Sequence, residues 1–218
     1  MYFSIIIRCK NEERWIGHAI QSVIDNFDKT KSEIIIVDNN STDNSMDIVN
    51  LFSNIHTNTH RIKIINIDNY TPGLSINLAV KNSNYENILI LSSHCQIKKI
   101  NFGKIKKLLE NNVAIWGKQI PIYFGKKINR QRYIWKNFED KDNINYFSKG
   151  ENRFFLHNAL AIYKKKTLIN YPFDENLIGK EDRYWGINMI DKGHKIYYDS
   201  ELVCHHHYTN NGATWKNI

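Results

Sequence analysis

Short runs of β-branched residues recur along the first part of the sequence. A run of this kind suits a strand that is buried on both faces in the middle of a parallel sheet. Between the runs, apolar residues recur every three and four positions, which is the period of an amphipathic helix. The predicted strands cover residues 2–7, 34–37, 63–68, 87–91 and 113–119, and the predicted helices cover 12–27, 44–52, 74–79 and 102–110.

The alternation of strands and helices predicts a doubly wound α/β fold. We expect a Rossmann-like, mostly parallel central sheet with helices on both faces and right-handed crossovers. Beyond residue 154 the pattern adds a strand over 156–163, a turn at 172–175, a helix over 183–191 that Gly193 ends, and a strand over 196–198. No Gly/Ser linker interrupts the sequence, so we expect one domain over 1–218.

The segment from Ile120 to Phe154 has no clean period and mixes aromatic with charged residues. We interpret it as an excursion of the same domain, either a mobile lid over a binding site or a covering helix and loop. Interleaved rings and basic side chains also suit single-stranded nucleic acid, whose bases stack on rings. Nucleic acid is nevertheless a disfavoured partner, because no ribonucleoprotein-type or oligonucleotide-fold motif is present.

The sequence has a formal charge of +8, with 30 Lys and Arg against 22 Asp and Glu. This excess favours polyanionic partners such as a phosphorylated ligand or an anionic membrane surface, although a solvated basic surface is the simpler alternative. The three cysteines have no paired spacing, which indicates free thiols in a reducing compartment. The apolar run near the N-terminus is too short to span a bilayer and lacks a signal-peptide layout, so we expect a cytoplasmic protein.

Polar side chains follow the predicted strands at their carboxyl ends, which is where open α/β sheets bind ligands. Asp38 and Asn39 follow one strand, and Arg8 and Asn11 follow another. Plain turns are the alternative, with Ser41 or Thr42 capping the next helix. Nearer the C-terminus, Glu181 and Asp182 open a helix, where acids also serve as ordinary dipole partners. Of the three adjacent histidines, His205 and His207 would share one face of a strand and could bind one metal ion.

Four segments together resemble a family 2 glycosyltransferase of the GT-A fold, in the right order and over nearly the whole chain. They are SIIIRCKNEERWIGHAIQSV, EIIIVDNNSTDNSMDIV, GLSINLAVKNSNYENILILSS and FDENLIGKEDRYWGINMIDKGHKIYY. The resemblance implies an inverting transfer from a nucleotide-sugar donor to a hydroxyl of a glycan or lipid-linked acceptor. The expected setting is the synthesis of surface polysaccharide, such as capsule, O-antigen or lipopolysaccharide, in bacteria.

The resemblance also assigns roles to positions of this sequence. Residues 1–119 become a nucleotide-binding half and 120–218 an acceptor-side half. Asp182 becomes the catalytic base, because a carboxylate can take the proton of an acceptor hydroxyl during attack, and Glu181 supports it. The implied nucleotide contacts are Arg8, Asn11, Asp38, Asn39, Gly73 and Ser93, and the implied acceptor contacts are Asn158 and Trp185.

The sequence departs from the family where an Asp-x-Asp motif normally holds Mn²⁺ or Mg²⁺. Ser92-Ser93-His94-Cys95 stands there, without a carboxylate, so a divalent metal cofactor is doubtful. Either His94 joins His205 or His207 around a softer ion, or His and Arg side chains meet the diphosphate directly, which we favour. A satisfied buried histidine is the simpler reading of His94. The motif is similar to a Ser-x-His subgroup of bacterial polysaccharide transferases with a closing tryptophan, here Trp215.

Two other functions stay open. A nucleotidyltransferase would share the sheet and a nucleotide pocket, but the loop RCKNEE lacks the glycines expected after its first strand. A catalytically inactive nucleotide-sugar-binding module is the second alternative, since the acidic motif is absent. For location, we expect reversible attachment to the inner face of an anionic membrane. The predicted contact is residues 125–136, with Lys126, Lys127, Arg130, Arg132, Tyr133 and Trp135.

Overall fold

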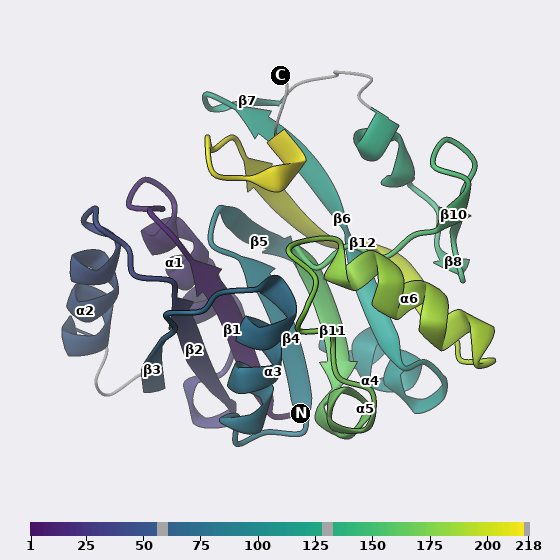
Figure 1. Ribbon diagram of the computed structural model, residues 1–218, viewed down its shortest axis with the longest axis horizontal. Helices are drawn as coiled ribbons and strands as arrows, with labels where there is room; N and C mark the ends of the chain where they lie inside the picture. Colours follow the sequence, from purple (N-terminus) through teal and green to yellow (C-terminus); the bar gives the residue numbers. More distant parts are fainter. Residues whose placement is uncertain (56–60, 128–132, 216–218) are drawn as a thin grey trace.

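One mixed sheet runs through the computed structural model, which describes residues 1–55, 61–127 and 133–215. The order of its main strands is β3-β2-β1-β4-β11-β6-β12-β5 (Figure 1). These strands are β1 (Phe3–Cys9), β2 (Ser32–Asp38), β3 (Arg61–Asn66), β4 (Asn87–Ser92), β5 (Cys95–Lys99), β6 (Ala114–Tyr123), β11 (Leu160–Lys164) and β12 (Ile196–His207). Short strands β7 (Lys126–Lys127) and β8 (Asn143–Ile144) pair with β6 and β12, and β9 (Phe147–Ser148) pairs with β10 (Arg153–Phe154).

The sheet is mostly parallel, as the alternation of strands and helices predicts. β1 pairs in parallel with β2 and β4, β2 with β3, and β12 with β6. Only β11 and β5, among the main strands described, run against their neighbours. The predicted fold class is therefore confirmed. The carboxyl ends of β1, β2 and β4 reach one edge of the sheet, where the polar loops gather.

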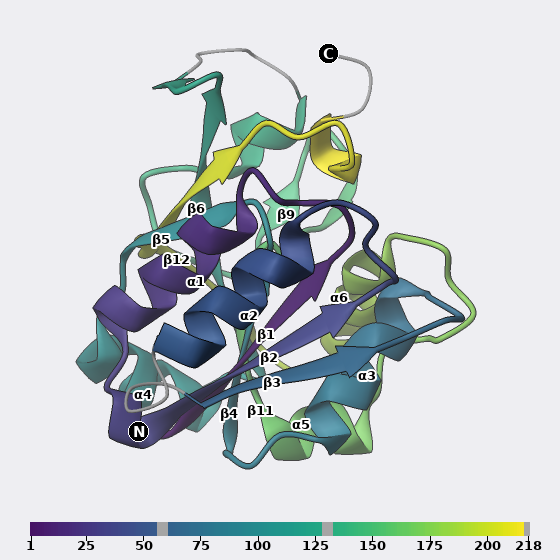
Figure 2. The same ribbon diagram turned by 90° about the vertical axis from the view of Figure 1, so that its left-hand side faces the viewer.

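Helices cover both faces of the sheet, and each face has its own core (Figure 2). One face packs against α1 (Ile16–Asn26), α2 (Ser45–Ile55) and α4 (Phe102–Asn111), through residues such as Ile20 and Val49. The other face packs against α3 (Pro72–Lys81), α5 (Lys165–Asn170) and α6 (Glu181–Asp191), through residues such as Ile76 and Met189. Three short 3-10 turns, Lys29–Lys31, Tyr133–Asn137 and Ala213–Trp215, complete the described elements.

Two strands differ from the sequence prediction. The strand predicted to end at Tyr198 continues as β12 to His207, through an irregularity between Asp199 and Val203. Its partner β5, which the pattern missed, pairs with that continuation. The polar stretch from Asp199 to Glu201 reads as a turn in sequence, but here it forms a bulge in one strand. This continuation carries the three histidines into the sheet.

The described parts of the segment from Ile120 to Phe154, residues 120–127 and 133–154, contribute strands to the sheet and side chains to its core. Its first residues extend β6 to Tyr123, so the expected division at residue 119 falls inside a strand. Further along, Phe138 and Tyr146 are buried against Trp116. Among the described residues, no helix combines the length and apolarity needed to cross a bilayer. The three cysteines are free, as predicted, and all are buried.

Candidate active site

The loops after β1 and β2 interlock through polar side chains at the sheet edge. Asp38 accepts hydrogen bonds from the backbone N–H of Ser41 at 3.0 Å and from its hydroxyl at 2.6 Å. Asn11 accepts from the N–H of Thr42 at 2.7 Å. Ser41 and Thr42 therefore build this loop and do not cap α2, in contrast to the prediction. At the start of α2, the Asp43 carboxylate accepts the N–H of Ser45 at 3.0 Å.

This interlocking brings four predicted nucleotide contacts to one place. Arg8 and Asp38 lie close together at the carboxyl ends of β1 and β2, because the two strands are parallel and Cys9 pairs with Asp38. The N–H of Asn39 donates to the carbonyl of Cys9 at 3.0 Å, and Lys10 donates to the carbonyl of Asn39 at 2.6 Å. The loop pair therefore gathers carboxylate, amide and guanidinium groups at one edge of the sheet, and their contact with a nucleotide stays a prediction.

Arg8 links this edge to the start of α6. Its guanidinium donates to the Glu181 carboxylate at 3.2 Å, across 173 positions of sequence. Burial works against the charged form of Arg8, but Tyr70, Glu181 and Asp182 outweigh it and raise the pKa of Arg8. Burial raises the pKa of Glu181, against the pull of Arg8. The first strand and the acidic pair, predicted as donor and acceptor sides of one site, therefore meet.

Asp182 is held by two backbone donors. Its carboxylate accepts from the N–H of Asn158 at 3.0 Å and from the N–H of Arg183 at 2.7 Å. Burial nevertheless raises the pKa of this carboxyl, against the effect of those two bonds. A carboxylate fixed in this way keeps lone pairs for a further proton, and a raised pKa makes it a better base. The prediction that the acids open a helix is confirmed, since α6 begins at Glu181.

The side chains of the two predicted acceptor contacts, Trp185 and Asn158, are both buried and hydrogen-bonded inside the protein. Trp185 is buried, donates from its ring nitrogen to the carbonyl of Tyr171 at 2.7 Å, and packs against Tyr163 and Phe173. It is a core residue, so its prediction as an acceptor contact is wrong: the helix turns this position toward the sheet. The side chain of Asn158 is also buried and accepts from the Tyr163 hydroxyl at 2.5 Å. Asn158 positions Asp182 through its backbone N–H.

Gly73 and Ser93 are both buried. A Cβ atom on Gly73 would lie 2.2 Å from the carbonyl oxygen of Asp174, so this glycine allows α3 to pack closely on the turn before α6. That packing covers Gly73 and contradicts its prediction as a nucleotide contact. Ser93 lies in the two-residue turn between β4 and β5, at the edge where the nucleotide loops gather.

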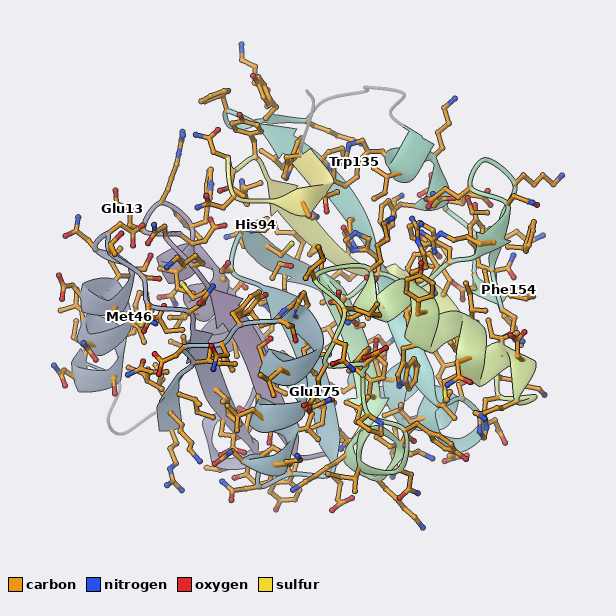
Figure 3. All side chains as sticks on the ribbon, viewed as in Figure 1. Glu13, Met46, His94, Trp135, Phe154 and Glu175 are labelled. Carbon is orange, nitrogen blue, oxygen red and sulfur yellow. The ribbon has the colours of Figure 1, made fainter. Side chains whose placement is uncertain are left out.

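His94, labelled in Figure 3, is the second residue of that turn and has a partner at each ring nitrogen. Its Nδ1 lies 3.2 Å from the Glu12 carboxylate and its Nε2 lies 3.0 Å from Nε2 of His206. Nδ1 of His206 lies 2.8 Å from the Gln119 carbonyl oxygen, and the Gln119 amide nitrogen lies 3.0 Å from Nδ1 of His157. We call these five residues, Glu12, His94, His206, Gln119 and His157, the histidine network.

His205 and His207 do not join His94, in contrast to the prediction. Alternation along β12 turns His206 into the network and turns its two neighbours to the opposite face. There His207 stacks on Trp15, with ring centroids 4.2 Å apart. Burial lowers the pKa of His207 to about 4 and also lowers the pKa of His205. The alternation along β12 therefore contradicts the prediction that His205 and His207 lie beside His94 at the diphosphate.

The positions of these histidines also decide whether they could bind a metal ion together. In the part of the chain that the structure describes, no group of three or more His, Cys, Asp or Glu residues is arranged to hold one. The set expected from the sequence, His94 with His205 and His207, is split between two faces of β12. His94 and His206 face each other through Nε2, with Nδ1 of each next to Glu12 or Gln119, so these two rings offer an ion two nitrogens only. The residues present therefore do not fit a complete protein-built metal site.

Sequence reasoning missed four members of the network. Glu12 looks like a helix-dipole partner, but α1 begins only at Ile16 and Glu12 is buried beneath His94. Gln119 and His157 carried no motif. The signal that could have found His206 is its place between the two histidines we selected, on the other face of the same strand.

Trp215 closes the open side of the network. It is buried in the last described turn and packs against His206 and Trp135, with centroid separations of 5.7 and 5.1 Å. The indole nitrogens of Trp215 and Trp135 are buried and have no acceptor among the described residues. Trp135, predicted as a membrane contact, is thus an interior residue. Arg130, Arg132 and the side chain of Tyr133, from the same prediction, lie outside the described part of the structure.

Comparison with known proteins agrees with this geometry. The chain is 24% identical over 213 residues to a dolichyl N-acetyl-glucosaminyl phosphate diacetamidodideoxyglucuronosyltransferase of Methanococcus voltae, covering 93% of this chain and 65% of the relative. It is 27% identical over 206 residues to a poly(ribitol-phosphate) beta-glucosyltransferase of Bacillus spizizenii, covering 90% and 30%. The chain therefore spans less than two thirds of either relative.

Solved structures show the same fold. TarS residues 1–349 from S. aureus, in complex with UDP-GlcNAc, matches with a TM-score of 0.74 at 20% identity, over 100% of this chain and 62% of that one. Residues 4–171 match the sequence profile described as "Glycosyl transferase family 2", a range that includes the loops after β1 and β2, the β4–β5 turn and β11. With its GT-A sheet and this match, the chain belongs to glycosyl transferase family 2.

Proposed function

We propose that the protein is an inverting glycosyltransferase that moves a sugar from a nucleotide-sugar donor to an acceptor hydroxyl. One observation carries the proposal: Arg8, at the strand end with the nucleotide loops, contacts Glu181 at 3.2 Å, and the neighbouring Asp182 is a positioned carboxylate with a raised pKa. A donor bound at the β1 and β2 loops would therefore extend toward a general base. The relatives named above are glycosyltransferases, which supports the same reading.

The reaction needs one proton acceptor and one stabilised leaving group. Asp182 takes the proton of the acceptor hydroxyl as the oxygen attacks the anomeric carbon. The bond from that carbon to the diphosphate breaks on the opposite face, and the diphosphate departs with the electron pair. The anomeric configuration is thereby inverted. Arg8 and Glu181 orient the two sides of the site relative to each other.

The developing charge on the diphosphate requires compensation. We propose that His94 supplies it electrostatically from the β4–β5 turn, with the indole N–H groups of Trp135 and Trp215 as further donors. Both ring nitrogens of His94 are engaged, so its effect does not require a new hydrogen bond to phosphate. The buried, unpartnered indole nitrogens support this assignment. The expected reaction is independent of Mn²⁺ and Mg²⁺.

For the acceptor, we propose a glycan or lipid-linked saccharide of a bacterial surface polysaccharide. Three relatives support this class by their names: an O-antigen chain rhamnosyltransferase, a minor teichoic acid biosynthesis protein and the poly(ribitol-phosphate) beta-glucosyltransferase. The donor would place its nucleoside between Asn11 and Asp38 and its diphosphate toward His94. Asn158 contributes by holding Asp182.

Such an acceptor also suggests where the protein works. We propose reversible binding to the cytoplasmic face of an anionic membrane through the β6–β7 hairpin. Phe124, Lys126 and Lys127 are exposed there, next to one another. Each basic residue near an anionic surface contributes about 1 kcal/mol. Co-sedimentation with anionic vesicles at low salt, lost in a Lys126→Glu/Lys127→Glu variant, is the expected result; no sedimentation at low salt would contradict it.

The test of the function is a product assay with a panel of nucleotide sugars and polysaccharide precursors, with and without EDTA. The account predicts a glycosylated product of inverted configuration and release of nucleoside diphosphate, undiminished by EDTA. Release of inorganic diphosphate would indicate a nucleotidyltransferase, and binding without turnover an inactive module. Activity that is lost in EDTA and restored by Mn²⁺ would contradict only the proposal that the reaction needs no metal ion, and the transfer function would stand.

A further inference from the structure

Two arginine side chains from different elements meet at one carboxylate near the proposed base. Arg153 begins β10, which lies against α6 (Figure 1), and Arg183 lies in the first turn of α6, directly after Asp182. Nε and Nη2 of Arg153 lie 2.9 and 2.5 Å from Oε2 of Glu151, and Nη2 of Arg183 lies 3.1 Å from the same oxygen. The other oxygen of Glu151 accepts from the Asn137 amide at 3.1 Å. We call Arg153, Arg183 and Glu151 the arginine cluster.

The cluster contains guanidinium donors that have no acceptor. A guanidinium carries five N–H groups. Among the described residues, the Arg183 guanidinium donates only to Glu151, and its Nε is buried without an acceptor. Arg153 also donates to the carbonyl of Phe154, labelled in Figure 3, at 3.0 Å, and its guanidinium lies 4.8 Å from the ring centroid of Phe155. A buried donor without an acceptor destabilises the protein, so an oxygen atom supplied by a ligand would remove that cost.

Arg183 also gives a ligand access to the cluster. Its side chain is 29% exposed, against 12% for Arg153 and 6% for Glu151. Burial lowers the pKa of Arg153; Glu151 offsets part of that effect and the charge of Arg183 adds to it. The two guanidiniums therefore repel each other, and a single carboxylate lies between them. An anion that reaches Arg183 from solvent would reduce this repulsion.

The cluster lies within electrostatic reach of Asp182 but forms no ion pair with it among the described residues. Asp182 instead accepts the backbone N–H groups of Asn158 and Arg183. Burial raises the pKa of Asp182, and the positive charge of Arg153 is among the effects that oppose it. A ligand group held by the cluster would therefore lie next to the hydroxyl from which Asp182 takes a proton.

The charges of this region allow a bound anion during transfer. Three guanidiniums face three carboxylates, and these groups belong to Arg8, Arg153, Arg183, Glu151, Glu181 and Asp182. When Asp182 takes the proton of the acceptor, its carboxylate becomes neutral and one positive charge is left without a partner. An anionic group of the acceptor would balance that charge. Before the proton moves, the same anion raises the pKa of Asp182 and makes it a stronger base.

Two guanidiniums from different elements suit a phosphate group. A guanidinium binds phosphate or carboxylate through paired N–H donors. The oxygens of a phosphate are arranged tetrahedrally, so two of them can face two separate guanidiniums. The cluster already contains one carboxylate, Glu151, which leaves the Nε of Arg183 without an acceptor.

We propose that Arg153 and Arg183 form an acceptor subsite, which binds a phosphate group of the acceptor and so places the acceptor hydroxyl at Asp182. The inference rests on the proposed function, because that function makes the bound molecule an acceptor. Two sources of phosphate share this chemistry: a phosphodiester within a polymer chain and the diphosphate of a lipid-linked saccharide.

Binding is tested on the full chain by nuclear magnetic resonance of the arginine Nε–H groups, with the signals of Arg153 and Arg183 assigned by single Arg→Lys variants. One probe is bis(glycerol) phosphate, a phosphodiester, and the other is methyl diphosphate. A saturable shift of the Arg183 Nε–H signal is expected, and the probe that binds more tightly identifies the source of the phosphate. No shift with either probe, or a saturable shift with glucuronate alone, would overturn the proposal.

Two substitutions separate phosphate binding from a structural link between β10 and α6. Arg183→Gln keeps the backbone N–H that holds Asp182 and the pair between Arg153 and Glu151, so the protein should fold. Followed at the Arg153 Nε–H signal, it should bind the probe about tenfold more weakly or worse, as expected for a lost charge-assisted hydrogen bond. Glu151→Gln removes the negative charge between the arginines and should bind the probe more tightly.

Arg61→Gln is the matched control for these variants. Arg61 is an exposed arginine at the start of β3, so this variant should bind the probe as the wild type does. Unchanged affinity in Arg183→Gln would refute the assignment. Weaker binding in a folded Glu151→Gln protein would also refute it, because a purely structural cluster loses its order when the shared carboxylate loses its charge.

Transfer activity provides a separate test. With a donor and a phosphate-bearing acceptor identified by the product assay, Arg183→Gln should raise the acceptor KM about ten- to a hundredfold, with the donor KM little changed. The defect should be smaller with an acceptor analogue that lacks phosphate. A raised donor KM would place Arg183 at the donor diphosphate and overturn the proposal. A wild type without transfer activity would remove the proposed function, and the probe titrations would still decide whether the cluster binds phosphate.

Discussion

Asp182 and Glu181 are neighbours in sequence that meet different partners. Glu181 binds the Arg8 guanidinium, whereas Asp182 accepts two backbone N–H groups. Burial raises the pKa of both carboxyls. Glu181 is thereby committed to an ion pair, and Asp182 is the acid whose lone pairs are available to a substrate. The assignment of the base to Asp182 follows from this difference.

The pH dependence of transfer should report Asp182. A general base works only when ionised, and burial raises the folded pKa of this carboxyl above its ordinary value. We therefore expect kcat/KM to fall as pH decreases through that raised pKa, with a midpoint above the value of about 3.9 for a free aspartate. Initial rates across an acidic pH series measure it. A midpoint at or below the free value would show that another group is the base.

The free energy of unfolding should depend on pH through the histidines, in a different pH range from that of the transfer reaction. Burial lowers the folded pKa of His157 and of His207 to about 4, and lowers that of His205 and His206. A lowered histidine pKa means that the neutral ring favours the folded state. This contribution is complete above the unfolded value of about 6.5 and is lost as pH falls from there toward about 4.

Thermal unfolding followed across this range is the measurement. The wild-type melting temperature should drop more between pH ~6.5 and ~4 than that of a His207→Gln variant, which removes one of the groups that must take up a proton. His194→Gln, in the loop before β12, is the control and should keep more of the wild-type dependence than His207→Gln, because His194 is not among the groups that shift the pKa of His207. Identical curves for His207→Gln and wild type would contradict the role of His207.

At the scale of elements, α3 and the turn before α6 meet at Gly73. A Cβ atom there would lie 2.2 Å from the Asp174 carbonyl oxygen and 2.9 Å from its carbon, which are backbone atoms that cannot rotate away. Gly73→Ala should therefore lower the free energy of unfolding by about 1–3 kcal/mol, as overpacking does. Chemical denaturation measures the loss. Gly179→Ala, whose Cβ would meet no atom within 4 Å, should change stability little.

The sequence pattern predicted the elements whose burial is uniform and missed those whose burial is mixed. β1, β2 and β4 are buried along nearly all of their length, so their apolar runs are unmistakable. β5 and the second half of β12 alternate buried with partly buried or exposed positions, and they carry cysteine and histidine as buried residues. A histidine is buried there only because partners on distant segments satisfy its ring nitrogens, and sequence spacing does not reveal those partners.

The residues of the candidate site could likewise be predicted only in part from the sequence. Asp38, Arg8 and the acidic pair were predictable because each follows or opens a recognisable element. The histidine network was not, since Gln119 and His157 are brought to His206 by the pairing of β6 with β12 and by the loop before β11. Trp185 was misassigned because its neighbours are site residues. On a helix, one position of sequence is enough to turn a side chain from the site into the core.

At the scale of the whole molecule, the site is assembled from both parts of the chain. The loops after β1 and β2 come from the first part, α6 and the β12 histidines come from the second, and the two meet through Arg8–Glu181 and through the histidine network. Binding of the donor and transfer of the sugar should therefore depend on different substitutions in one folded protein.

The most direct test measures transfer and nucleotide affinity together in two single variants. Asp182→Asn should reduce transfer about a hundred- to ten-thousand-fold and leave the calorimetric affinity for the nucleotide product unchanged. Asp38→Ala should weaken that affinity about tenfold or more, the effect of one lost charged hydrogen bond, while the exposed control Asp47→Ala changes neither. Near wild-type turnover in a well-folded Asp182→Asn protein, or unchanged affinity in Asp38→Ala, would contradict the account.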